Sequence, residues 1–182
     1  SSSHVVREHE IETLPCGLIS AMGGKWTTCR QIALDALKAA EVILGPLPCT
    51  RQLPIIGSTD QLNQLPDLLV KQQKHLKEHL PKTQLLSKQI AHLQSSHGLN
   101  ALSIISQSSE EKLVPLSQVI PICQAEIEHA IQNEYAVTPT DVLARRCRLA
   151  MVDFTEANRL LPIVHNLLKE QNKVISELNL EN

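Results

Sequence analysis

The stretch LISAMGGKWTTCRQIALDALKAAEVIL (residues 18–44) decides how the first part of the chain folds. Residues 18–22 form a short apolar run, which predicts a buried strand, and Gly23-Gly24 stops that run. Gly45-Pro46 then ends a helix with a cap and a breaker. We therefore expect a strand, a glycine turn and a helix over residues 17–45. The expected apolar face of the helix consists of Ala33, Ala36, Leu37, Ala40, Ile43 and Leu44.

The residues before this stretch predict a short hairpin. His4-Val5-Val6 and His9-Glu10-Ile11 contain β-branched residues, and Leu14-Pro15-Cys16-Gly17 has the composition of a turn. Residues 4–22 are therefore expected to form two extended segments around a turn.

The rest of the chain is helical in pattern. Residues 49–60, which follow Pro48, contain the proline, glycine, serine and threonines of a linker, and residues 61–182 predict helices joined by short loops. The predicted fold is mainly α. A hairpin and strand–turn–helix in residues 1–48 precede the linker and an α-helical bundle.

Three helix starts carry local signals. Pro121 is expected at the first position of a helix that includes Ile127 and Ile131. The segments Thr138–Asp141 and Asp153–Glu156 have the spacing of a capping box, in which a short polar side chain and an acidic one satisfy the first backbone amides.

The composition argues against several classes of protein. The 182 residues carry a net charge of −2, so the surface as a whole offers no electrostatic attraction for nucleic acid. No apolar run reaches the roughly 20 residues of a membrane helix. The five cysteines form no C-x-x-C pair, which favours free thiols over a disulfide framework or a zinc ribbon. The sequence begins with Ser1 and shows no leader, which suggests a chain whose start lies elsewhere.

The turn between the predicted strand and helix is the sharpest candidate site. Glycines at Gly23 and Gly24 allow another molecule to approach the backbone, and the first amides of the following helix lack internal partners. That end of a helix favours an anion, and Lys25 adds a positive charge. A Walker loop is excluded, because G-x-x-x-x-G-K-[ST] does not occur. From spacing alone, a plain turn with a solvated lysine is the favoured alternative.

Two blocks of sequence occur in the order and separation of a known family. The first block is Arg7-Glu8-His9, then Gly17-Leu18-Ile19, then GGKWTTCR at residues 23–30. The second includes AEI at 125–127, EYA, and DVLARRCRL at 141–149. Together they resemble the FAD-dependent, quinone-linked glycerol-3-phosphate dehydrogenases, whose patterns are R-[ND]-H, G-L-[IL], G-G-K-[WL]-T-T-Y-R and P…AEV…EYA…T..D.L.RR.RL.

The resemblance implies that this chain is the C-terminal portion of such an enzyme. The missing N-terminal portion would hold most of the FAD, because no subset of the glycines here forms G-x-G-x-x-G. The enzyme would oxidise glycerol 3-phosphate to dihydroxyacetone phosphate, with hydride transfer to FAD and electrons passed to quinone. By itself the chain is expected to be inactive.

The same resemblance assigns roles to residues. Arg7 would bind the phosphate of the substrate, since a guanidinium binds phosphate through two points. The cofactor-binding residues would be Gly23, Gly24, Lys25, Trp26 and Thr27, with the turn beside the flavin edge that gains negative charge. No catalytic base and no metal ligand is assigned. The resemblance is compatible with a homodimer and with a cytoplasmic location or peripheral contact with the inner face of a membrane.

The chain also departs from the family pattern. Cys29 stands in place of the usual Tyr, Met151 in place of an aromatic residue, and His97 in place of a common Tyr before Gly98. The packing around the flavin is therefore expected to differ from the family standard.

For the other candidate residues, the sequence favours ordinary structural roles. Arg145, Arg146 and Arg148 are expected to pair with Glu126, Glu134 or Asp141, rather than to bind nucleic acid. His75 and His79 could share a helix face but have no third ligand, and are expected at the surface. Cys123 and Cys147 are expected to be buried. A non-catalytic helical interaction module, or a degenerate relative of the family, is the alternative function.

Overall fold

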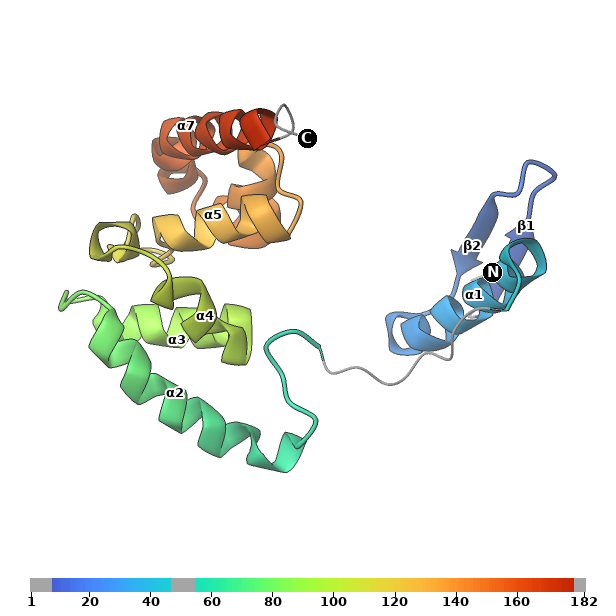
Figure 1. Ribbon diagram of the computed structural model, residues 1–182, viewed down its shortest axis with the longest axis horizontal. Helices are drawn as coiled ribbons and strands as arrows, with labels where there is room; N and C mark the ends of the chain where they lie inside the picture. Colours follow the sequence, from blue (N-terminus) through green and yellow to red (C-terminus); the bar gives the residue numbers. More distant parts are fainter. Residues whose placement is uncertain (1–7, 47–54, 179–182) are drawn as a thin grey trace, which may run out of the picture. The chain divides into compact units, whose positions relative to one another are not determined.

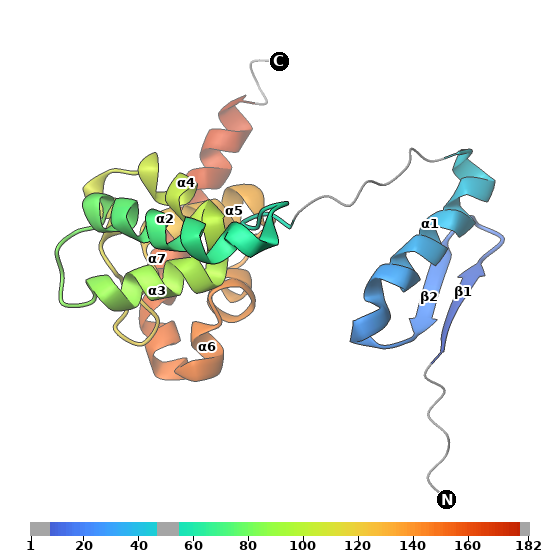
Figure 2. The same ribbon diagram turned by 90° about the horizontal axis from the view of Figure 1, so that it is seen from below.

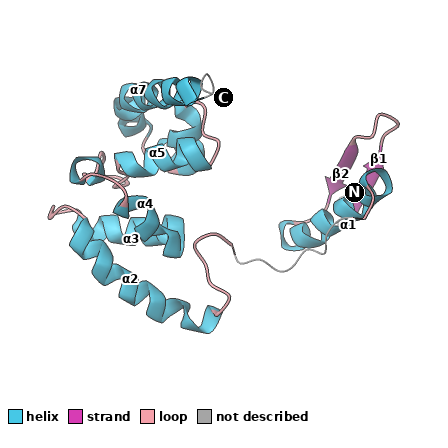
Figure 3. Cartoon of the chain, in the orientation of Figure 1, coloured by secondary structure: helices cyan, strands magenta, loops and turns pink. Residues whose placement is uncertain are grey.

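A computed structural model describes residues 8–46 and 55–178, with side chains described as far as residue 171. The chain separates into two compact units, Ser1–Gln52 and Leu53–Asn182. Arg7 and the predicted extended segment at residues 4–6 lie outside the described residues. Helices predominate, and the only sheet in the described part has two strands (Figure 3). The predicted mainly α fold is confirmed.

The first unit is a hairpin with one helix (Figures 1 and 2). Strand β1 (His9–Thr13) pairs antiparallel with β2 (Ile19–Gly23), so that His9 lies opposite Gly23. The hairpin closes where the amide of Leu14 donates to the carbonyl of Leu18 at 2.8 Å. Helix α1 (Cys29–Leu44) contacts both strands and ends at Gly45, which has φ +80°. The predicted strand, glycine turn and helix are all present.

Two details of that prediction are wrong. The run at 18–22 is not a buried strand, because Leu18 is 60% and Met22 is 45% exposed. The expected apolar face of α1 is also largely exposed to solvent: Leu37, Ile43 and Leu44 are between 41% and 72% exposed. A two-stranded sheet and one helix can cover only one face of each other. As a result, no described residue of this unit is buried.

The second unit is a set of packed helices (Figure 1). Short 3₁₀ turns at Leu62–Gln64, Gly98–Asn100 and Glu110–Leu113 and a six-residue π-helical segment, Asp141–Arg146, complete it. The α-helices are α2 (Leu65–His79), α3 (Leu86–His97), α4 (Ala101–Ser106), α5 (Gln124–Asn133), α6 (Leu149–Val152) and α7 (Phe154–Leu178).

Two helix starts follow their sequence signals and one does not. The amide of Asp141 donates to Oγ1 of Thr138 at 3.2 Å while the carboxylate of Asp141 accepts from the amide of Thr138, which is a complete capping box. The carboxylate of Asp153 likewise accepts from the amide of Glu156 at 2.9 Å. Pro121 does not open α5, because the capping pair there is Cys123 and Glu126, and the helix begins at Gln124.

The core of this unit consists of two aliphatic clusters. One cluster joins α5, α6 and α7 through residues such as Ile127, Leu149 and Leu160. The other joins α2, α3 and α4 through residues such as Leu76 and Leu93, and it reaches Ala125 at the start of α5. Helix α5 therefore contacts both clusters. No helix in the described ranges is long and apolar enough to cross a membrane.

Candidate functional site

The two glycines of the turn are required by their surroundings. Gly23 has φ +74°, and a Cβ there would lie 2.8 Å from the carbonyl oxygen of Glu8 across the hairpin. Gly24 has φ +87°, and its Cβ would lie 2.5 Å from Cδ1 of Ile32. Both φ values lie in the left-handed region that side chains disfavour. The sequence therefore places glycine where the chain must leave β2 and pass close to β1 and α1.

Lys25 and Thr28 fix the start of the helix. Lys25 is extended (φ −126°, ψ 153°) and caps a 3₁₀ turn, Trp26–Thr28, that leads into α1. Oγ1 of Thr28 accepts from the amide of Lys25 at 3.3 Å and donates to its carbonyl oxygen at 3.0 Å. The amides of Trp26 and Thr27 precede the first internal donor of the turn and have no acceptor among the described residues. The turn therefore offers two free N–H groups beside one lysine.

Exposed apolar side chains lie next to these donors in the sequence. The indole of Trp26 is 89% exposed, and Met22, next to Gly23 at the end of β2, is exposed as well. A bare tryptophan next to free backbone donors is typical of a surface that another molecule or chain segment covers, because isolated apolar surface of this extent is unfavourable in water.

His9 holds the strand to the helix beneath the turn. Its Nε2 lies 2.7 Å from Oδ2 of Asp35 in α1, and the side-chain Nε2 of Gln31 donates to Oδ1 of the same carboxylate at 2.9 Å. The hydrogen bond with His9 lowers the pKa of Asp35. The sequence singled out His9 as part of a motif but gave no reason to pair it with Asp35, which is 26 residues away.

A buried carboxylate organises the second unit. Oε1 of Glu126 accepts hydrogen bonds from His92 at 2.9 Å and His97 at 3.1 Å, while Oε2 accepts from the amide of Cys123 at 3.0 Å. Burial alone would raise the pKa of Glu126, but the hydrogen bonds from both histidines outweigh it and lower the pKa to about 2. The carboxylate is therefore ionised at neutral pH.

Two of the three arginines in the run pair as predicted, whereas no ion pair of Arg148 occurs among the described residues. Arg145 donates to Asp141 at 2.5 Å, and Arg146 donates to the backbone carbonyl of Glu134 and lies 3.7 Å from its carboxylate. Glu126, the third predicted partner, pairs with histidines instead. Arg148 takes a left-handed conformation with φ +61° at the start of α6.

The remaining histidine and cysteine candidates show no sign of a functional site. His75 is exposed, 3.5 Å from Glu78, and the ring of His79 bonds to the backbone of His75, so these two histidines lie at the surface. Cys123 is buried, and Cys147 is half-buried.

The sequence noted His97 only as a departure from the family pattern and gave no reason to pair it with His129. His97 and His129 come close to each other and to Glu134, although they are distant in the sequence and form no local motif.

Residues 48–176 match the family described as the C-terminal domain of alpha-glycerophosphate oxidase. This match covers more than half of the chain. The chain belongs to that family. Its membership confirms the resemblance found in the two sequence blocks, and it makes the helices from α2 to α7 the family's C-terminal domain.

Curated relatives extend the likeness across most of the chain. It is 30% identical over 172 residues to a probable mitochondrial glycerol-3-phosphate dehydrogenase of Dictyostelium discoideum, covering 92% of this chain and 26% of that protein. It is 33% identical over 194 residues to the mitochondrial glycerol-3-phosphate dehydrogenase of Saccharomyces cerevisiae, covering 91% and 28%. The human mitochondrial enzyme is 30% identical over 175 residues, covering 90% and 22%. The chain thus spans about a quarter of the length of these relatives.

Proposed function

We propose that this chain works as part of an FAD-dependent glycerol-3-phosphate dehydrogenase, in which it supplies the turn at Gly23–Thr27 to the flavin and a helical C-terminal domain. The turn itself carries the proposal. Its two glycines bring the backbone to a tight corner, the amides of Trp26 and Thr27 have no acceptor among the described residues, and the indole of Trp26 is exposed beside them.

These residues fit a flavin edge chemically. A flat aromatic ring system with carbonyl and nitrogen acceptors matches a site that offers two backbone N–H donors and an exposed indole. FAD, when bound, accepts the hydride that leaves C2 of glycerol 3-phosphate. The amides of Trp26 and Thr27 would hold the ring by hydrogen bonds, and Lys25 would place a positive charge where negative charge develops.

Exposed apolar side chains of the first unit support the same proposal. Met22 on β2, Leu18 just before that strand, and Leu37, Ile43 and Leu44 on α1 are exposed although they are apolar. A dinucleotide-binding domain formed by other residues of a longer protein would cover these side chains. The relatives are long enough to contain such a domain, since this chain matches about a quarter of each.

Substrate binding, electron transfer and location complete the proposal. Arg7, which lies outside the described residues, would bind the phosphate of glycerol 3-phosphate. Electrons would pass to a quinone, which requires contact with a membrane surface, and the absence of a membrane-spanning helix in the described part is compatible with peripheral contact. A homodimer belongs to the same proposal.

Two substitutions in the complete enzyme test these roles. Lys25→Ala should lower kcat at least about tenfold, because the charge it supplies is needed as the transition state forms. Arg7→Ala should mainly raise the KM for glycerol 3-phosphate. Lys38→Ala, which changes an exposed lysine of α1, is the matched control and should change neither parameter.

The outcome that contradicts these roles is specific. If Lys25→Ala and Arg7→Ala changed kcat and KM equally, neither role would stand.

The isolated chain should be colourless and should not reduce a dye in the presence of glycerol 3-phosphate. A yellow, active preparation would show that this chain alone holds the flavin.

A further inference from the structure

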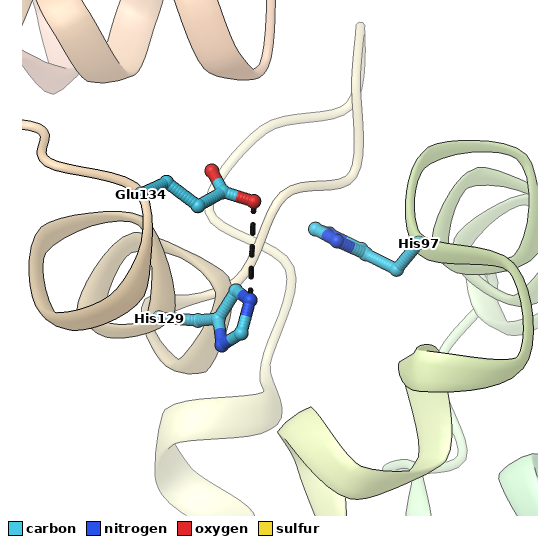
Figure 4. Close-up of side chains that lie close together, drawn as sticks. All are labelled: His97, His129 and Glu134. Carbon is cyan, nitrogen blue, oxygen red and sulfur yellow. Dashed lines mark ion pairs between the residues drawn. The ribbon is translucent and has the colours of Figure 1, made fainter. Parts of the chain in front are cut away.

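The side chains of His97, His129 and Glu134 converge in the second unit (Figure 4). One nitrogen or oxygen of each lies within 4.8 Å of those of the other two. His97 is the last residue of α3, His129 belongs to α5, and Glu134 follows the end of α5. The two imidazole rings meet edge to face with centroids 5.9 Å apart.

We propose that His97, His129 and Glu134 bind a first-row divalent metal ion such as Zn²⁺, which links the end of α3 to the end of α5. Two imidazoles and one carboxylate are a ligand set that suits Zn²⁺, with its fourth position left for water. Tetrahedral Zn²⁺ needs ligand atoms about 3.4 Å apart. Nε2 of His129 and Oε1 of Glu134 already lie 3.8 Å apart, so small side-chain rotations complete the geometry.

Each ligand has a neighbour that orients it. Glu126 accepts a hydrogen bond from Nε2 of His97, and a neutral ring that gives one proton away keeps a lone pair on its other nitrogen. Nδ2 of Asn133 lies 3.2 Å from Nδ1 of His129 and donates to the backbone oxygen of His129 at 3.4 Å. His129 binds the ion through Nε2 once this amide turns its oxygen to the ring and accepts the Nδ1 proton. Arg146 lies near Oε2 of Glu134, on the other oxygen from the one that faces His129.

Burial and access also fit a metal site. The three side chains are between 14% and 34% exposed, so an ion can enter without unfolding the domain. They line a cavity of about 440 Å³ together with Ser96 and Asn100, which leaves room for a metal-bound water.

Titration of the 182-residue chain with Zn²⁺ tests the proposal. The chain carries no purification tag, and its accessible thiols are alkylated first, because Cys16 and Cys29 are exposed and would bind Zn²⁺ themselves. We expect one equivalent to bind. Each of His97→Gln, His129→Gln and Glu134→Gln should weaken binding at least about tenfold. The double variant His75→Gln/His79→Gln removes an exposed histidine pair and should leave the affinity unchanged.

Co²⁺ supplies a readout that needs no variant. It should produce visible d–d absorption of tetrahedral intensity and should shift the ring resonances of two of the eight histidines. Mg²⁺, which prefers oxygen ligands, should not compete. Absence of a saturable site, or loss of binding only in the His75/His79 variant, would overturn the proposal. So would unchanged affinity in folded His129→Gln and Glu134→Gln.

Discussion

Glu126 and His92 form a nearly buried pair in the helical unit. Oε1 of Glu126 lies 2.9 Å from Nε2 of His92, and the two side chains are 3% and 13% exposed. The same oxygen accepts from His97, and the other oxygen caps α5 through the amide of Cys123. One carboxylate thus joins two residues of α3 to the start of α5.

Replacement of this carboxylate should destabilise the helical unit. Glu126→Gln removes the charge that both histidines face and keeps the size of the side chain, so we expect a loss of about 2–3 kcal/mol at pH 7. Glu128→Gln on the same helix is the control, because its pair with half-exposed Lys112 is worth no more than about 1 kcal/mol. Urea unfolding followed by circular dichroism measures both, and equal losses in the two variants would contradict the role of Glu126.

Gly24 should tolerate a side chain less well than Gly17. Both have positive φ, at +87° and +85°, but a Cβ on Gly17 meets nothing within 4 Å while one on Gly24 meets Ile32 at 2.5 Å. Gly17→Ala should therefore lower the free energy of unfolding only through backbone strain, by about 1 kcal/mol. Gly24→Ala should lower the free energy of unfolding by more than this. Amide hydrogens of α1 should exchange about tenfold faster in Gly24→Ala than in Gly17→Ala.

A second substitution separates the contact from the strain. Ile32→Val removes the atom that the new Cβ would meet, so Gly24→Ala/Ile32→Val should exchange more slowly than Gly24→Ala alone. No rescue by Ile32→Val would mean that the close approach to Ile32 does not limit this position.

Local signals in the sequence predicted local structure well. The capping pairs Thr138–Asp141 and Asp153–Glu156 were predictable because each pair is three residues apart and its chemistry depends on that spacing. The glycine turn was predictable for the same reason, since positive φ at Gly23 and Gly24 is a local requirement.

Contacts between distant residues were not predictable in this way. His97 lies 29 residues from Glu126, and no periodic pattern connects them. The prediction of a covered apolar face on α1 was wrong for a different reason. The helix has apolar residues on two sides, and the sequence does not state which side meets the hairpin; the strands cover one and leave Leu37, Ile43 and Leu44 bare.

The carboxylate of Asp35 should titrate below its ordinary range. The hydrogen bond with His9 lowers its pKa from the usual value of 3.8. A lowered pKa in the folded state means that the stabilising contribution is present above pH 3.8 and is lost as the pH falls through the lower, folded value. Carbon-13 NMR of the Asp35 carboxyl group should show a midpoint below 3.8. His9→Phe should move this midpoint upward, whereas a midpoint unaffected by His9→Phe would rule out the pairing as its cause.

The thiols should react in the order of their exposure. Cys16 and Cys29 are exposed, whereas Cys123 is buried and its pKa is raised, chiefly by burial and further by the nearby charge of Glu126. Thiolates are the reactive species, so Cys123 should resist iodoacetamide in the folded chain while Cys16 and Cys29 are alkylated at pH 8.

Peptide mass spectrometry at timed intervals follows each thiol separately. In urea, Cys123 should react as fast as Cys16, which shows that folding and not its local sequence protects it. Glu126→Gln removes a negative charge that raises the pKa of Cys123, so it should speed alkylation of Cys123 in the absence of urea but leave Cys16 unchanged. If Cys123 reacted as fast as Cys16 in the folded chain, α5 could not begin in the buried position that places Glu126 between His92 and His97.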